Sequence, residues 1–403
     1  MKWSMNEYYN WVANGQPVNL NVTELHIYGL SIMCFDGIEK LPNLITLKCT
    51  SSNLQSLKGI ENLKNLICLY CASNKLISLK GLENLHNLIE LHCYSNKLTS
   101  LKGIENLHNL TTLDCSRNEL TSLDGIENLY NLKILNCSCN KLTLLNGIEN
   151  LHNLTTLDCL GNNLTSLNKI ENLHNLEILN CSVNELQSLN CIEKLCNLIE
   201  FNCAHNKLIS LDCCKTLNNL TTLICAANEL TSLNGIENLH NLETLICEKN
   251  KLTSLNPIQN LYNLTHVNCF QNALTSLNGI ENLVNLTSLH CSNNQLQSLN
   301  GIENLCNLRT LYCHSNKLTS LAELENLVGL RMLYCSDNKL ESLNGIEHLY
   351  NLIELCCDYN NLQSLNQIVN LRQLKFILYH NNPIDHISSD IQRILNGIRG
   401  GVF

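Results

Sequence analysis

Residues 88–109 read LIELHCYSNKLTSLKGIENLHN, and nearly the whole chain is built from this unit of 22 residues. Its pattern, L-x-x-L-x-C-x-x-N-x-L-x-S-L-x-G-I-E-N-L-x-N, recurs without insertion in fifteen copies between residues 44 and 373. A degenerate copy covers residues 22–43, and a truncated copy begins at Leu374. Self-similarity at a fixed period is typical of a solenoid, in which each repeat stacks on its neighbours.

The two halves of the repeat predict different structures. The segment L-x-x-L-x-C alternates apolar and variable residues, which is the period of a half-buried strand. In the copy that begins at Leu308, we expect Leu311 and Cys313 to face inward, and Tyr312 and His314 to face outward. The Asn that follows can satisfy backbone groups of the turn with its side-chain amide. The return has about ten residues, which favours a short 3-10 or extended segment over a full helix.

This pattern resembles the leucine-rich-repeat signature L-x-x-L-x-L-x-x-N-x-L over essentially the whole chain. The repeat length is similar to that of phosphatase-regulating proteins and bacterial internalins. One departure is systematic, because Cys replaces Leu at the sixth position in all fifteen copies. The resemblance implies an α/β, mostly β, repeat solenoid. This would be a curved arc with a concave parallel sheet and short 3-10 or extended convex returns. It also implies protein binding on the concave sheet, although a fold does not fix a partner.

The two ends of the chain depart from the repeat and predict caps. Trp3 and Trp11 both fall in the first segment, where Ser4 and Glu7 have the spacing of a capping box. Near the other end, Ser389 can begin a short helix. A solenoid must close its open ends. We therefore divide the chain into an amino-terminal cap at 1–21, a solenoid of about sixteen 22-residue repeats plus a truncated one at 22–383, and a carboxyl-terminal cap at 384–403.

Composition and charge disfavour two classes of partner. The net charge is −9, which disfavours a nucleic-acid partner, since nucleic-acid affinity rests on Lys and Arg. No stretch reaches about eighteen continuous apolar residues, so we expect no membrane span. The amino terminus, MKWSMNEYYN, lacks the apolar run of a signal peptide. We therefore expect a cytoplasmic location.

Cysteine is abundant, with 24 residues, and most of them follow the repeat. We interpret the fifteen template cysteines as small, buried apolar side chains that remain thiols. A linear row of them lacks the tetrahedral convergence that zinc requires. One irregular group leaves a metal or redox role open: Cys191, Cys196, Cys213 and Cys214.

The remaining candidate chemistry gives no catalytic constellation. Five of the fourteen histidines recur at one template position, as His86 and His108 do, instead of converging. The recurring glutamates, such as Glu83 and Glu105, indicate either a solvated surface or a calcium site. Neither a phosphate loop nor a dinucleotide fingerprint is present in the sequence. We therefore predict a protein that is not an enzyme and needs no cofactor.

The outward strand positions vary where the rest of the template is nearly constant, so they are the candidate binding positions. Aromatic residues and Arg, which are enriched in binding hot spots, gather near the carboxyl end. The predicted contact residues are His290, Arg309, Tyr312, His314, Arg331, Tyr334 and Asp358. A smaller set near the amino end includes Tyr70 and His92, and ordinary solvated sheet positions remain the alternative for either set.

Three functions are compatible with this sequence. The first is a non-enzymatic scaffold that binds a protein on its concave face. The second is a regulatory subunit of an enzyme such as a phosphatase. The third is an internalin-like surface adhesin, which would need an export signal and an anchor.

Overall fold

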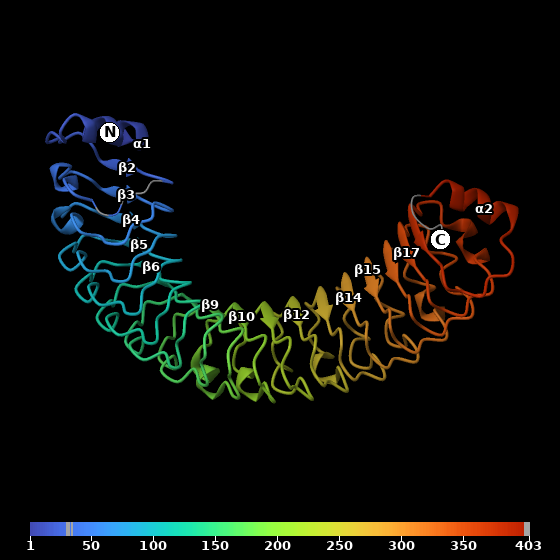
Figure 1. Cartoon of the computed structure of the whole chain (residues 1–403). Coiled ribbons are helices and arrows are strands. Elements are labelled where there is room, and N and C mark those ends of the chain that lie inside the picture. The colour runs from blue at the N-terminus through green and yellow to red at the C-terminus, as the bar shows by residue number, and fades with distance from the viewer. Residues whose placement is uncertain (30–32, 34, 399–403) are drawn as a thin grey trace. The chain divides into compact units, whose positions relative to one another are not determined.

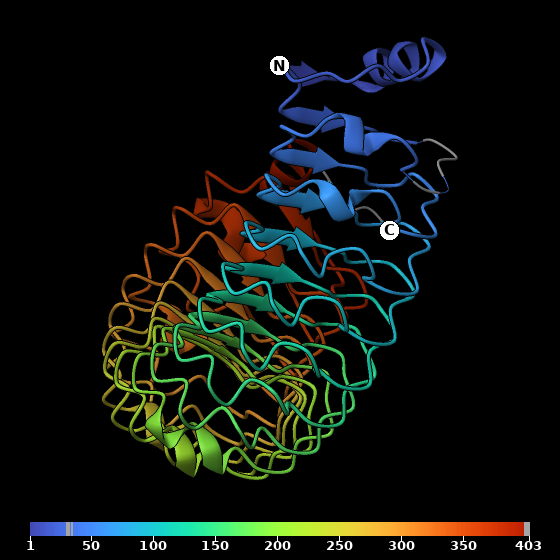
Figure 2. The same cartoon turned by 90° about the vertical axis from the view of Figure 1, so that its left-hand side faces the viewer.

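The computed structural model describes residues 1–29, 33 and 35–398. The chain forms two compact units, Met1–Asn202 and Cys203–Phe403. Each unit is a coil of 22-residue turns that contributes one short strand per turn, with the strands on the concave side of the unit (Figure 1). Figure 2 shows the strands of the first unit on one side of the coil and the return loops on the other.

The first unit carries ten of the described strands, and all of their pairings are parallel. Register advances by one repeat from strand to strand, as when Leu91 pairs with Leu113. The helices of this unit are α1 (Met5–Ala13) and the 3-10 helices η1 (Ile38–Lys40), η2 (Ile60–Asn62) and η3 (Asn190–Lys194). The strands are β1 (Lys2–Trp3), β2 (Glu24–His26), β3 (Thr46–Lys48), β4 (Cys68–Tyr70), β5 (Glu90–His92), β6 (Thr112–Asp114), β7 (Ile134–Asn136), β8 (Thr156–Asp158), β9 (Ile178–Asn180) and β10 (Glu200–Asn202).

The second unit carries eight described strands, again in parallel register. Its helices are η4 (Asp212–Cys214), η5 (Asn256–Ile258), η6 (Ala322–Leu324), η7 (Asn366–Asn370) and α2 (Ser389–Asn396). The strands are β11 (Thr222–Ile224), β12 (Thr244–Ile246), β13 (His266–Asn268), β14 (Ser288–His290), β15 (Thr310–Tyr312), β16 (Met332–Tyr334), β17 (Glu354–Cys356) and β18 (Phe376–Leu378). The predicted mostly β, leucine-rich-repeat type of solenoid with short returns is confirmed.

The strand alternation places residues as predicted. Leu311 and Cys313 are fully buried, whereas Tyr312 and His314 are partly exposed on the strand face. The same parity separates Cys68, which is partly exposed, from the buried Cys71. Each turn of the coil therefore has one apolar interior, and the variable residues are confined to its surface.

An asparagine after each strand from β4 to β18 ties neighbouring turns together. The side-chain amide of Asn96 donates to the carbonyl of Cys93 in its own turn and to that of Cys71 in the turn before, at 2.9 and 3.1 Å. Its carbonyl oxygen accepts the N–H of Leu76 at 2.9 Å. The predicted role of this Asn is confirmed, and it satisfies buried backbone groups that would otherwise be costly.

The cysteine ladder, defined as the fifteen template cysteines Cys49 to Cys357, lies entirely in the interior. All fifteen side chains have an exposed fraction of 0%. Several donate their S–H to a carbonyl of the next strand, as Cys115 does to Asn136 at 3.4 Å. Burial raises the pKa of Cys71, Cys225 and Cys269 to about 12. The ladder consequently has the character of apolar, protonated thiols and not of a reactive site.

The return segment depends on the residue at the template glycine position. Nine glycines there have φ between 98° and 110°, a region that disfavours side chains: Gly59, Gly81, Gly103, Gly125, Gly147, Gly235, Gly279, Gly301 and Gly345. Where Cys191, Cys213, Pro257, Glu323 or Gln367 replaces glycine, the return forms a 3-10 helix, η3 to η7. Lys169 alone keeps a left-handed φ of 91° without glycine. In these five turns the 3-10 helix includes the replaced position, because an L-residue avoids the glycine conformation and takes up a helical one. In η1 and η2 the glycines Gly37 and Gly59 keep a left-handed φ, and the helix begins only after them.

The recurring glutamates complete these glycine turns. The Gly103 N–H donates to Glu105 Oε2 at 2.8 Å, and eight other turns repeat this bond at 2.7–2.9 Å. The carboxylate thus replaces water as the acceptor for a backbone N–H that the turn leaves unpaired. The glutamates therefore stabilise the turn as hydrogen-bond acceptors. This role differs from both expectations from the sequence, a solvated surface and a calcium site.

Both ends carry the helices that the sequence indicates, and their role as caps remains a prediction. α1 packs against β1 and β2, and Trp11 lies 6.0 Å from Trp3 between ring centroids. The Ser4 N–H donates to Glu7 Oε2 at 2.9 Å, which confirms that arm of the predicted capping box. β1 is an additional strand that the sequence pattern does not indicate. At the other end, α2 buries Ile391 and Leu395.

Gly279 and Gly301 form a matched pair that tests how closely the backbone of the preceding turn approaches the template glycine. Gly279 and Gly301 share a φ of 106°, but an added Cβ at Gly279 would lie 2.5 Å from the Leu255 carbonyl oxygen. At Gly301 its nearest contacts are at 3.5 Å. Both Gly→Ala changes should cost roughly 1–2 kcal/mol through left-handed strain. We expect Gly279→Ala to cost about 1–3 kcal/mol more through the clash. Urea denaturation of both variants measures this, and equal midpoints would contradict it.

The buried thiols make stability sensitive to high pH. An unfolded thiol loses its proton near pH 8.5, whereas Cys225 and Cys269 in the fold keep theirs to about 12. Between about pH 8.5 and 12 the folded state therefore binds more protons than the unfolded state, and stability falls by about 1.4 kcal/mol per pH unit for each of these two cysteines. In the Cys225→Ala/Cys269→Ala variant, the urea midpoint should fall less steeply from about pH 9 to about pH 11.

The matched control replaces two exposed cysteines, Cys139 and Cys306, with alanine. This variant should lose stability with pH as steeply as the unmodified chain. If both double variants lose stability with rising pH as steeply as the unmodified chain, the cysteine ladder does not control the loss of stability at alkaline pH.

Candidate functional site

The strand face of the second unit carries a stack of rings, which we call the ring ladder: His290, Tyr312 and Tyr334. These residues pair in register on β14, β15 and β16. The Tyr312 and Tyr334 rings stack with centroids 4.6 Å apart and planes at 11°. The His290 ring lies 4.9 Å from that of Tyr312, at 46°. The structure therefore brings together three of the predicted contact residues in one continuous row.

The hydroxyl at the end of the ladder is engaged within the protein. Tyr334 donates a short hydrogen bond to Glu354 on β17. Burial, followed by this bond to the carboxylate, raises the pKa of Tyr334 well above its ordinary value. At Tyr334, the ring ladder consequently offers a partner ring surface more than a free phenol hydroxyl.

The two histidines of the predicted set lie close together and are uncharged near neutral pH. The ring centroids of His290 and His314 are 6.0 Å apart. Burial lowers the pKa of both, and the neighbouring His314 lowers that of His290 further. The Nε2 atom of His290 is buried without a hydrogen-bond partner among the described residues. This pair contributes neutral aromatic surface and an unused nitrogen at the side of the ring ladder.

The remaining predicted contact residues are not members of the ring ladder. Asp358 is 8% exposed, accepts a hydrogen bond from the Ser336 hydroxyl, and lies 3.4 Å from His380 Nε2. Arg309 and Arg331 precede their strands and lie at the opposite, amino-terminal edge of the sheet. The set therefore divides into a ring ladder with His314, a largely buried carboxylate, and two edge cations.

Arg309 occupies a gap in the template. Gly329 stands where most copies have an asparagine, and the Arg309 Nη1 atom donates to the Gly329 carbonyl at 2.9 Å. A Cβ at Gly329 would collide with the guanidinium. The missing side chain makes room for Arg309, which is thereby held along the edge of the sheet.

The first unit has a similar ring pair with the same kind of carboxylate partner. Tyr70 stacks on His92 with centroids 4.6 Å apart and planes at 4°, and Lys48 Nζ lies 4.7 Å from the Tyr70 centroid. The Tyr70 hydroxyl donates to Glu90 Oε2 at 2.6 Å, which together with burial raises the pKa of Tyr70 to about 12. In both units, the Tyr and Glu are 20 residues apart, a spacing visible in the sequence.

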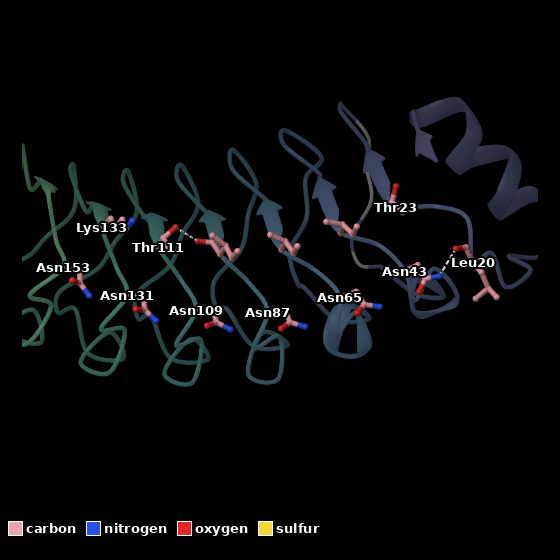
Figure 3. Close-up of a pocket in the computed structure, with 13 residues that line it drawn as sticks. Leu20, Thr23, Asn43, Asn65, Asn87, Asn109, Thr111, Asn131, Lys133 and Asn153 are labelled. Atoms are coloured by element: carbon pink, nitrogen blue, oxygen red, sulfur yellow. Dashed lines mark hydrogen bonds between the residues drawn. The ribbon is translucent and has the colours of Figure 1, made fainter.

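An open groove of about 920 Å³ follows the amino-terminal edge of strands in the first unit (Figure 3). One wall is a row of asparagines whose side chains donate to the preceding turn, as Asn87 does to the Lys64 carbonyl at 2.8 Å. The other wall includes three isoleucines on successive turns, Ile45, Ile67 and Ile89. In the sequence, the residues of this wall stand at the first variable position of the repeat. The alternation of apolar and variable residues in the strand does not distinguish that position from the other variable ones.

The irregular cysteines lie in return segments of both units. Cys191 lies in η3 of the first unit, whereas Cys213 and Cys214 lie in η4 of the second. A hydrogen bond with Cys213 and burial raise the pKa of Cys214. Within the described part of the chain, no group of three or more His, Cys, Asp or Glu side chains is placed to hold a metal ion. No helix in that part is long and apolar enough to cross a membrane.

The comparisons with known proteins match this geometry. The sequence profile of the family "Leucine Rich repeats (2 copies)" matches residues 108–150, 284–326 and 306–349. No curated protein matches the chain. A leucine-rich-repeat protein of Leptospira interrogans has 28% sequence identity and a TM-score of 0.82, over 99% of this chain and 100% of that one.

Two further solved structures share the fold. The functional domain of InlJ from Listeria monocytogenes, which includes a cysteine ladder, is 29% identical with a TM-score of 0.76, over 85% of this chain and 74% of that one. The HAESA receptor-kinase ectodomain of Arabidopsis, in complex with a peptide hormone, is 21% identical with a TM-score of 0.61, over 91% of this chain and 70% of that one. This chain has the fold of leucine-rich-repeat proteins, with 22-residue repeats in which cysteine takes the place of one consensus leucine.

Proposed function

We propose that this protein is a non-enzymatic scaffold that binds another protein through the strand face of its second unit. The observation that carries this proposal is the ring ladder of His290, Tyr312 and Tyr334 on consecutive strands. Aromatic side chains supply large contact area with few rotatable bonds. Because the rings are already stacked, ordering them on binding should cost little entropy.

The ring ladder differs from the residues at the equivalent positions of other repeats. Equivalent positions on β7 and β9 carry Asn136 and Asn180, and those on β6 and β8 carry Asp114 and Asp158. These side chains serve the turn beyond the strand, as when Asn180 accepts the Ser182 N–H at 3.2 Å. A solenoid can therefore be built without rings at this position, which favours a binding role for the rings.

Proteins of the same fold support a protein or peptide partner. The HAESA ectodomain carries a bound peptide hormone, which shows that this fold can hold a peptide. A cytoplasmic location remains our prediction. A second candidate function is that of an internalin-like surface protein, which the cysteine ladder shared with the InlJ domain favours. Surface labelling of intact cells of the source organism distinguishes the two locations.

Truncating the ladder should weaken binding without unfolding the protein. We expect Tyr312→Ala and Tyr334→Ala each to cost about 1–3 kcal/mol of binding free energy, because each removes a stacked ring from the contact surface. The measurement is quantitative affinity capture from a lysate of the source organism, followed by titration of the captured protein against each variant. Circular dichroism of each variant checks that the fold is retained.

Asn136→Ala and Asn180→Ala are the matched controls at the same strand position in the first unit. Both should retain the captured protein. Tyr334→Phe removes only the bond to Glu354 and should bind nearly as well as the unmodified chain. If the two tyrosine variants and the two asparagine variants bind equally, the ladder is not the contact surface. Greater loss with the asparagine variants would move the site to the first unit.

A further inference from the structure

A row of positive side chains lies along the amino-terminal edge of the last four strands. We call this the cation row: Arg309, Arg331 and Lys375, which directly precede β15, β16 and β18. Ile353 fills the intervening place before β17. The Arg331 N–H donates to the Arg309 carbonyl at 2.8 Å, and Lys375 donates likewise to Ile353 at 2.8 Å. These bonds fix the positions in register, and all three charged side chains are exposed.

The charges of the cation row are not neutralised within the described part of the chain. No carboxylate there forms an ion pair with any of the three, although Lys141 and Lys251 pair with Glu119 and Glu229 of neighbouring turns. Within the described residues, the hydrogen-bond partner of the Arg309 guanidinium is a backbone carbonyl, that of Gly329. The row therefore keeps its positive charge in a chain whose net charge is −9.

The same edge position elsewhere in the chain is rarely basic. In the thirteen preceding turns it is occupied by a single cation, Lys133, and by two carboxylates, Glu177 and Glu243. The others are Thr or Ile. Like charges on directly neighbouring strands are destabilising, so folding gives no reason to place Arg309 beside Arg331. A ligand of opposite charge does give a reason.

The cation row borders apolar surface. Tyr312 and Tyr334 of the ring ladder lie on the strands that begin directly after Arg309 and Arg331. Met332 and Phe376, at the first position of β16 and β18, are partly exposed on the same face. Between Met332 and Phe376 lies Glu354, a partly exposed carboxylate that accepts a hydrogen bond from the Tyr334 hydroxyl. A ligand on this part of the second unit would meet positive charge along one edge, and beside it aromatic and apolar surface with this one carboxylate.

We infer that the cation row and the ring ladder together bind an acidic peptide segment of the protein partner. Carboxylates of the segment pair with Arg331, Lys375 and the free face of Arg309, and its apolar side chains cover the rings. This inference rests on the proposed function and names the chemistry of the partner. A nucleic acid fits the surface less well, because its affinity depends on many basic contacts and the row supplies three.

The test uses the full chain and fluorescent probes of known composition. The probes are a copolymer of Glu and Tyr, a copolymer of Lys and Tyr, and single-stranded oligothymidylate, each titrated by fluorescence anisotropy. We expect the Glu–Tyr copolymer to bind, with an affinity that falls as salt is raised. The variant Arg331→Glu/Lys375→Glu should weaken this binding at least about tenfold, because two attractive contacts become repulsive.

Lys133→Glu is the matched control, since it reverses a charge at the same edge position in the first unit. It should change affinity by less than about twofold. Arg331→Thr introduces the residue found at Thr287 and removes the charge without reversing it. This variant should fold normally, as monitored by circular dichroism, and should bind the Glu–Tyr copolymer more weakly than the unmodified chain.

Three results would overturn the inference. One is equal affinity of the double variant and the unmodified chain for the Glu–Tyr copolymer. Another is an equal loss with Lys133→Glu. The third is tighter binding of oligothymidylate that the same double variant abolishes, which would assign the row to a nucleic acid. None of these depends on the captured partner, so the inference can fail while Tyr312→Ala and Tyr334→Ala still support the ring ladder.

Discussion

The amide of the asparagine that follows each strand from β4 to β18 joins two turns of the coil through both of its polar atoms. In the copy around Asn96, the nitrogen donates to carbonyls of two successive turns and the oxygen accepts an N–H of the earlier one. The residue just before each such asparagine has a left-handed φ, as at Val183 with 55° and Asp337 with 53°. Left-handed backbone is costly for a β-branched residue such as Val. The fold retains it because the asparagine bonds leave the turn no alternative.

The conformation of this turn determines the register of the strands and therefore the packing of the interior. The strand after each turn starts one repeat further along, so Leu91 meets Leu113 and every leucine and ladder cysteine meets its own equivalent. Small apolar thiols fit this regular stack, and burial keeps them protonated. The uniform interior leaves no room for a converging polar site. Sequence differences between the repeats are therefore confined to the strand face, the two edges of the strands, and the return segments.

Those surfaces differ from one unit to the other. The second unit combines stacked rings with an edge that carries three cations, whereas the groove of the first unit is lined by asparagines and isoleucines. Both units contain a tyrosine that donates to a glutamate on the next strand. A recurring Tyr–Glu pair fixes the ring orientation before any partner arrives, which is what a preorganised contact requires.

The sequence alone determined the repeat, the strand parity, the role of the asparagine and the burial of the cysteines, because each depends on a pattern that returns every 22 residues. The row of His290, Tyr312 and Tyr334 was also predictable, since parallel register places equivalent positions side by side. Tertiary structure decided what those side chains do. Asp358 is paired with Ser336 and His380, and Arg309 fills the space left by Gly329. Such contacts form between residues about 20 positions apart, and they depend on the rotamer that each side chain adopts. A repeat pattern specifies where a side chain is attached but not its rotamer.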